Sequence, residues 1–85
     1  MHPYLVIDIN AEDHSMAFVD RAGKYHVARW TADPPVVGDD LDGTPPQLGS
    51  ALLKSRHGHT FPVIFDLVNV AQGDAFDRLH ASLTP

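Results

Sequence analysis

The chain has no cysteine, only two lysines and only one glutamate among its 85 residues. Without cysteine, neither disulfides nor thiolate metal clusters can reinforce a small core. Glutamate and lysine suit exposed helix surfaces, whereas the ten aspartates favour turns and caps. The composition therefore favours strands and loops over long solvent-facing helices.

Cations are scarce as well: six lysines and arginines stand against eleven acidic residues, a formal net charge of −5 with neutral histidine. Because nucleic-acid binding depends on cations that displace counterions from phosphates, this balance disfavours DNA and RNA as partners. An OB-like nucleic-acid-binding module remains an alternative, because aromatic rings on a small sheet can stack on bases. The candidate rings belong to Tyr4, Phe18, Tyr25 and Trp30. Only Lys24 and Arg29 accompany them, so we expect these rings to pack in the core.

The length and the apolar fraction of 44% predict one small folded domain over residues 1–85. The start of the chain has no basic segment, and Asp8 interrupts its apolar run. We therefore expect neither a signal peptide nor a membrane span, and a cytoplasmic protein with no membrane partner. A domain this small buries only about 60% of its unfolded surface. A homodimer or another protein partner is therefore an open alternative.

Residues 4–10 have the period-2 alternation of a β-strand, with Leu5 and Ile7 on one face and Tyr4 and Val6 on the other. Residues 60–70 form the longest run rich in β-branched side chains and predict a further strand. Its expected inward face consists of Val63, Phe65 and Leu67.

Residues 15–20 and 24–30 predict a hairpin, because the three-residue loop between them ends in a glycine that can adopt a positive φ. The expected register places Phe18 opposite His26, Met16 opposite Ala28 and Ala17 opposite Val27. Both faces of this hairpin are apolar. We therefore expect each face to be covered, by a helix, by barrel closure or by a second subunit.

Two short helices are predicted in the second half of the chain. Thr44 as N-cap, Pro45 at the first helical position and Gln47 form a capping-box pattern that predicts a helix over 45–56. Asp74 is placed to cap a final helix that extends to about Ser82. Its apolar stripe comprises Phe76, Leu79 and Leu83.

The element order β-β-β-α-β-α predicts a small α+β domain, a mostly antiparallel sheet of about four strands with two short helices. A partly open β-barrel of the OB or SH3-like kind is the main structural alternative, and it rests on strand order alone.

Residues 33–43 combine two prolines, two glycines and four carboxylates, which predicts a long acidic loop on the surface. A calcium loop is excluded, because an EF-hand needs a bidentate glutamate at its twelfth position, where the alignment places Gly49. We expect three aspartates of this loop to be largely exposed. The carboxylates of the loop either cap local turns or face a basic partner, with nearby apolar side chains as anchors. The proposed contact residues are Val36, Val37, Asp39, Asp40, Leu41 and Asp42. The alternative is that the valines pack back onto the core.

His57 and His59 are the candidate metal ligands, because imidazoles one residue apart on an extended segment can face the same side. A third ligand could come from Asp66 or from the acidic loop. The same histidines on either side of Gly58 equally suit a simple turn.

The sequence contains no catalytic pattern. Residues 48–52 lack the second glycine of a nucleophile elbow, and no glycine-rich phosphate loop is present. We therefore expect a non-catalytic protein-interaction module, inhibitor-like or adaptor-like, that requires no cofactor. A histidine-based metal-binding protein is the other alternative.

Overall fold

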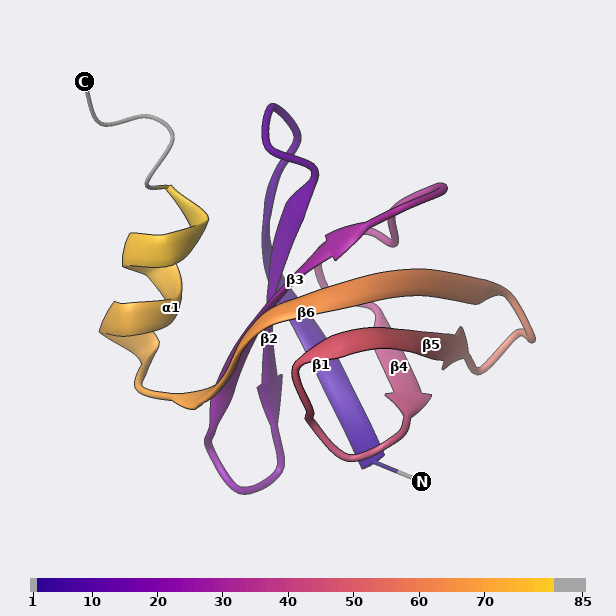
Figure 1. Cartoon of the computed structure of the whole chain (residues 1–85). Helices are drawn as coiled ribbons and strands as arrows, with labels where there is room; N and C mark the ends of the chain where they lie inside the picture. Colours follow the sequence, from indigo (N-terminus) through magenta and orange to yellow (C-terminus); the bar gives the residue numbers. More distant parts are fainter. Residues whose placement is uncertain (1, 81–85) are drawn as a thin grey trace.

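A computed structural model of the chain describes residues 2–80. Within this range, six antiparallel strands close into a barrel in the order β1-β2-β3-β6-β5-β4, and one short helix packs outside it (Figure 1). The elements are β1 (His2–Asn10), β2 (Ser15–Asp20), β3 (Tyr25–Trp30), β4 (Asp40–Gly43), β5 (Gly49–Ser55), β6 (Thr60–Val70) and α1 (Gln72–Leu79). The small-barrel alternative is therefore correct in its architecture, although the barrel is closed. The α+β sheet with two helices is wrong.

The barrel consists of two three-stranded meanders, β1-β2-β3 and β4-β5-β6. The pairs β3–β6 and β4–β1 join the meanders and close the barrel. In the part of the chain that the structure describes, no helix has the length and apolar character needed to cross a membrane.

The β2–β3 hairpin has the predicted register, with Phe18 opposite His26 and Ala17 opposite Val27. Its loop ends at Gly23, whose φ of 78° lies in the left-handed region that glycine adopts without strain. Both faces of the hairpin are covered, as its apolar composition requires. One face lines the barrel interior and the other packs beneath α1.

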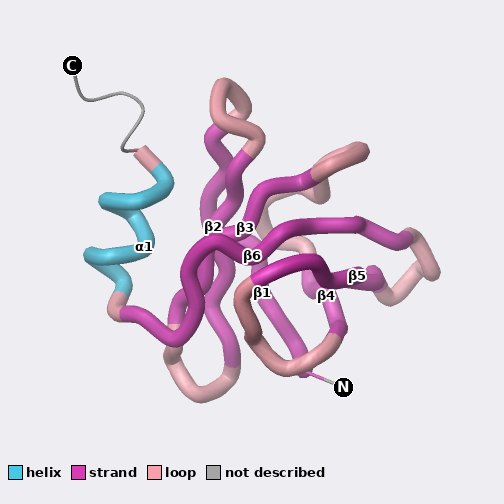
Figure 2. The backbone as a smooth tube through the Cα atoms, in the orientation of Figure 1, coloured by secondary structure: helices cyan, strands magenta, loops and turns pink. Residues whose placement is uncertain are grey.

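The core is divided by the barrel wall. The interior cluster consists of Tyr4, Val6, Met16, Phe18, Ala28, Leu41, Leu53, Val63 and Phe65. The exterior cluster joins Ala75 and Leu79 of α1 to Ala17 and Val27 on the outside of the hairpin. The helix thus covers only the β2, β3 and β6 side of the barrel, and the outer faces of β4 and β5 lie away from it (Figure 2).

Where the register between two strands shifts, the side chains that pointed into the barrel can be followed by ones that point outward. In β1, a shift between Val6 and Asp8 breaks the simple alternation, so Ile9 packs against the interior cluster together with Val6. In β6, Phe65 lies inside the barrel but Leu67 joins the exterior cluster, because the β3–β6 pairing also shifts. The predicted inward face of residues 60–70 is therefore split between the two clusters.

The helix expected over 45–56 is wrong, because Gly49–Ser55 forms β5 and pairs with β6. Burial along this segment alternates with period 2: Leu53 is buried, whereas Leu52 and Lys54 are exposed. Helical spacing and a capping-box pattern are weak local preferences, and the pairing with β6 together with the burial of Leu53 outweighs them.

The loop expected over 33–43 is wrong in its last part, because Asp40–Gly43 is the strand that closes the barrel. Leu41 points inward and is buried, while the aspartates on either side of it are exposed or half-buried. At Gly43, a Cβ atom would lie 3.3 Å from the carbonyl oxygen of Leu52 and would overlap the Leu53 side chain. A larger residue would therefore displace the buried Leu53 side chain, which favours glycine where β4 meets β5.

The final helix exists but begins earlier than predicted. It spans Gln72–Leu79, its N-cap is Ala71 without a side-chain hydrogen bond, and Asp74 lies in its first turn. The expected cap at Asp74 is therefore wrong, although a carboxylate in the first turn favours the helix dipole. Leu79 is buried as expected. The predicted positions Ser82 and Leu83 lie outside the described residues.

Candidate functional site

The proposed contact residues do not share one environment. Val36 and Val37 are 64% and 57% exposed, so the valines do not pack back onto the core. Asp40 is exposed, but Asp39 is half-buried. Asp42 is also half-buried, and Leu41 lies in the barrel interior and offers no accessible anchor. The expectation of three largely exposed aspartates thus holds for one of them.

The valines stand on a turn that is hydrogen-bonded to β1. Within the turn, the Asp39 backbone N–H donates to the Val36 carbonyl at 3.1 Å, and the Val36 N–H donates to Asp39 Oδ2 at 3.0 Å. The Gly38 N–H donates to the Val6 carbonyl at 2.8 Å, and the Val6 N–H donates to the Asp39 carbonyl at 3.0 Å. Four hydrogen bonds therefore fix the segment that presents the two exposed side chains.

Beside this turn, the outer surface carries two adjoining depressions of about 370 Å³ and 240 Å³ that share Asp40 and Arg56. We call the larger one the outer groove. Its lining residues are Pro3, Tyr4, Leu5, Val19, Asp20, Arg21, Asp40, Leu41, Asp42 and Arg56. Leu5, which is 38% exposed, lies opposite Val19 on one side and Asp40 on the other. The groove thus crosses β2, β1 and β4, and no residue of α1 lines it.

The negative and positive charges of the outer groove lie in different places. Two carboxylates, Asp40 and Asp42, project from β4, and the cations lie at the two ends, Arg21 after β2 and Arg56 after β5. Arg56 Nη2 lies 3.0 Å from Asp40 Oδ2 in an exposed ion pair. The side chain of Asp42 forms no hydrogen bond or ion pair with any residue between positions 2 and 80, and Lys54 is its register partner on β5.

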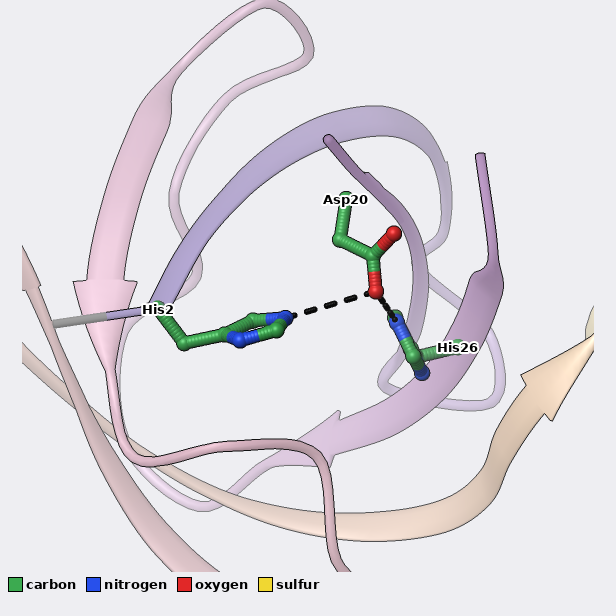
Figure 3. A group of neighbouring side chains, drawn as sticks. All are labelled: His2, Asp20 and His26. Carbon is green, nitrogen blue, oxygen red and sulfur yellow. Dashed lines mark hydrogen bonds and ion pairs between the residues drawn. The ribbon is translucent and has the colours of Figure 1, made fainter. Parts of the chain in front are cut away.

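A second polar cluster lies at one end of the barrel interior, where His2, Asp20 and His26 point toward one another (Figure 3). Asp20 Oδ2 is 2.8 Å from His26 Nε2 and 3.3 Å from His2 Nε2. Asp20 Oδ1 accepts hydrogen bonds from the backbone N–H groups of Ala22 at 2.9 Å and Lys24 at 3.0 Å. The carboxylate therefore ties the β2–β3 turn to β1 and β3.

The hydrogen bonds of His26 define its tautomer. The Asn69 backbone N–H donates to His26 Nδ1 at 3.0 Å, so this nitrogen must present a lone pair. His26 Nε2 then carries the proton and donates it to Asp20. Asn69 has a φ of 57° at the irregular part of the β3–β6 pairing, and this backbone conformation accompanies its bond to the ring.

Burial and hydrogen bonding set the ionisation of this pair. Burial lowers the pKa of His26, and the hydrogen bond to Asp20 opposes the shift only in part. Burial also disfavours the charged form of Asp20, but hydrogen bonds from His26 and the Lys24 backbone prevail and lower its pKa to about 2. The stable form is therefore a neutral imidazole that donates to a carboxylate.

A metal ion fits this cluster poorly. The ligand atoms of His2, Asp20 and His26 lie within 4.8 Å of one another, and they are the sole such group of three in the region that the structure describes. Binding through His26 Nε2 would move the proton to Nδ1, where it would face the N–H of Asn69. A histidine that binds a metal normally donates its other N–H to an acceptor. The tautomer therefore disfavours coordination.

His57 and His59 both lie exposed at the turn between β5 and β6. Among residues 2–80, no third ligand atom joins them in a group that could hold an ion. Asp66, one suggested third ligand, accepts a hydrogen bond from Arg29 Nε at 2.8 Å. The structure therefore does not assemble the site suggested by the spacing of the two histidines.

The aromatic residues are mostly structural. Tyr4 and Phe18 are buried inside the barrel, which removes them from any surface that could stack on bases. Trp30 is half-buried, and its ring centroid lies 5.4 Å from that of His14. The Tyr4 hydroxyl donates to the Thr44 carbonyl at 2.7 Å and so fastens the β4–β5 connection to the barrel.

Sequence reasoning placed His26 on the same hairpin face as Phe18 but did not identify the His2–Asp20–His26 cluster. Alternation along the hairpin also puts Asp20 on that face, and this pattern could have indicated that Asp20 and His26 lie close together.

Comparisons with protein-family models, curated proteins and solved structures found no match. Within residues 2–80, no buried side-chain nitrogen or oxygen lacks a hydrogen-bond partner. The interior cluster is thus a saturated structural network, and the accessible chemistry lies on the outer surface.

Proposed function

We propose that this chain is a non-catalytic protein-binding module, of inhibitor or adaptor type, that docks its partner on the outer groove and the adjoining Val36–Val37 turn. The observation that carries the proposal is the turn itself, which holds two neighbouring apolar side chains exposed in a conformation fixed by four hydrogen bonds. A surface ordered before binding loses little conformational entropy when a partner arrives. Valine adds to this advantage because its χ1 is already restricted.

Burial of the two valines would supply part of the binding free energy. Full burial of a valine side chain gains about 1.5 kcal/mol or more. Because Val36 and Val37 are 64% and 57% exposed in the free chain, burying the remainder supplies together about 2 kcal/mol, which is roughly twentyfold in affinity. The apolar floor of the outer groove, Leu5 and Val19, extends this surface over neighbouring strands.

A site-specific photocrosslinking experiment tests the proposal. A photoreactive side chain at Val37 is compared with the same side chain at Leu52, which is similarly exposed at 56% but lies on β5 outside the outer groove. We expect a discrete crosslinked protein from Val37 in the native host and none from Leu52.

The captured protein is then purified and titrated against variants. Val37→Asp should weaken binding by about tenfold or more, because a buried apolar contact is replaced by a charge. Leu52→Asp is the matched control and should leave the affinity unchanged. Equal crosslinking at both positions, or an affinity that does not respond to Val37→Asp, would refute a partner site at this turn.

A further inference from the structure

The outer groove places an apolar patch directly beside carboxylates. Leu5 of β1 is the register partner of both Val19 of β2 and Asp40 of β4. Neighbouring strands are about 4.8 Å apart, so the apolar floor and the carboxylates of β4 are separated by a single strand step. One short segment of a partner can therefore contact both.

The Asp42 carboxylate forms no ion pair within the described part of the chain, although Lys54 is its register partner on β5. Asp42 is half-buried in the groove wall, and its side chain has no ion pair or hydrogen bond with the residues described between 2 and 80. A carboxylate partly withdrawn from water gains from a charge-assisted hydrogen bond, which is stronger than a neutral one. A cation is thus the complementary group for this position.

Asp40 can exchange Arg56 for another cation with little loss of free energy. Its ion pair with Arg56 is exposed on both sides, and ion pairs of this kind contribute about 0–1 kcal/mol. Release of Arg56 would leave a second carboxylate available on the same strand.

We propose that the outer groove binds an extended polypeptide segment that carries a lysine or arginine within two residues of an apolar side chain. The cation contacts Asp42 and Asp40, and the apolar side chain rests on Leu5. This inference rests on the protein-binding function proposed above and specifies the chemistry of the partner. Electrostatic steering toward the acidic strand would act mainly on the association rate.

The charge pattern favours such a segment over a second copy of this chain. A twofold axis through the groove would bring Asp40 and Asp42 of both copies together, in a protein whose net charge is already −5. Like charges placed opposite one another destabilise an interface.

Selection of a random 12-residue peptide library on the full-length chain tests the inference. We expect enriched sequences to contain a basic residue within two positions of an apolar one. Their affinity, measured by fluorescence anisotropy, should fall about tenfold for Asp42→Asn, as expected for the loss of one charge-assisted hydrogen bond. Asp33→Asn removes an exposed carboxylate outside the groove and should have no effect.

Three results would overturn the inference. Enriched peptides that lack basic residues, or that bind Asp42→Asn as well as the original chain, would leave the protein-binding function intact but reject this partner chemistry. Failure to enrich any sequence would reject a linear segment, while crosslinking at Val37 would still decide the broader function. A dimer in analytical ultracentrifugation that Leu5→Lys dissociates would assign the groove to a second copy.

Discussion

Acidification should destabilise the folded barrel, because the buried His26 ring does not take up a proton as readily as it does in the unfolded chain. The ring is fully buried, accepts a hydrogen bond from the Asn69 backbone at Nδ1 and donates from Nε2 to Asp20. A second proton on Nδ1 would face the Asn69 N–H and break that bond. The groups that face the ring are His2 and Tyr4 of β1, Asp20 of β2 and the backbone of β6 at Asn69.

Whether stability rises or falls with pH follows from the direction of each pKa shift. The pKa of His26 is lowered in the folded state, so the unfolded chain takes up a proton as the pH falls through about 6.5 while the folded chain does not. Stability is therefore lost on acidification at up to about 1.4 kcal/mol per pH unit for this one group. The pKa of Asp20 is lowered from 3.8 to about 2, which adds about 2 kcal/mol above pH 3.8 that is lost toward pH 2.

Urea denaturation at pH 7.0, 5.5 and 4.5 measures this dependence. His26→Gln removes the titrating group but keeps an amide that can hydrogen-bond to Asp20. We expect this variant to lose about 1–3 kcal/mol at neutral pH and to show a smaller decline between pH 7.0 and 5.5. His57→Gln is the matched control, since its ring is exposed, and it should keep the original decline. A decline that His26→Gln leaves unchanged would refute the reasoning.

Substitutions at three further positions test the fold. Gly43→Ala should destabilise by about 1–3 kcal/mol in urea denaturation, because its Cβ would overlap the buried Leu53 side chain, and an unchanged midpoint would contradict the tight β4–β5 contact. Asn69→Val should cost about 1–3 kcal/mol, because a β-branched residue is strained at a φ of 57°, whereas Asn69→Gly should be tolerated. Tyr4→Phe removes the hydrogen bond to Thr44 and should cost about 1 kcal/mol. Burial raises the pKa of Tyr4 to about 12, so absorbance titration should show one tyrosine fewer ionising near pH 10 in the native chain.

Local pattern was sufficient to predict the strands whose alternation or turn chemistry is strong. The β2–β3 hairpin has its predicted register, and β6 spans the predicted residues 60–70. Barrel closure depends on β4 and β5, whose local signals are misleading. Residues 40–43 contain two aspartates and a single buried leucine, and the segment before β5 has the cap pattern of a helix. Pairing between strands distant in sequence decides these two elements.

The candidate site was predictable in its residue types but not in its geometry. The exposed valines lie in the expected segment, yet the turn that fixes them exists only because Val6 of β1 pairs with Gly38 and Asp39. Likewise, Asp20 and His26 share a hairpin face by alternation, but no sequence pattern places the Asn69 N–H against the ring. Both cases depend on contacts between segments more than 30 residues apart.

The interior network and the outer groove meet at Asp20. This residue lines one end of the groove, and its Oδ1 holds the turn that carries Arg21, a second lining residue. The same carboxylate accepts a hydrogen bond from His26 Nε2 through its other oxygen. Loss of this bond would remove one contact that positions the Asp20 carboxylate, while the backbone hydrogen bonds of Asp20 with Gly23 and Lys24 would still hold the turn. The histidine–aspartate network thus contributes to the wall of the outer groove through Asp20.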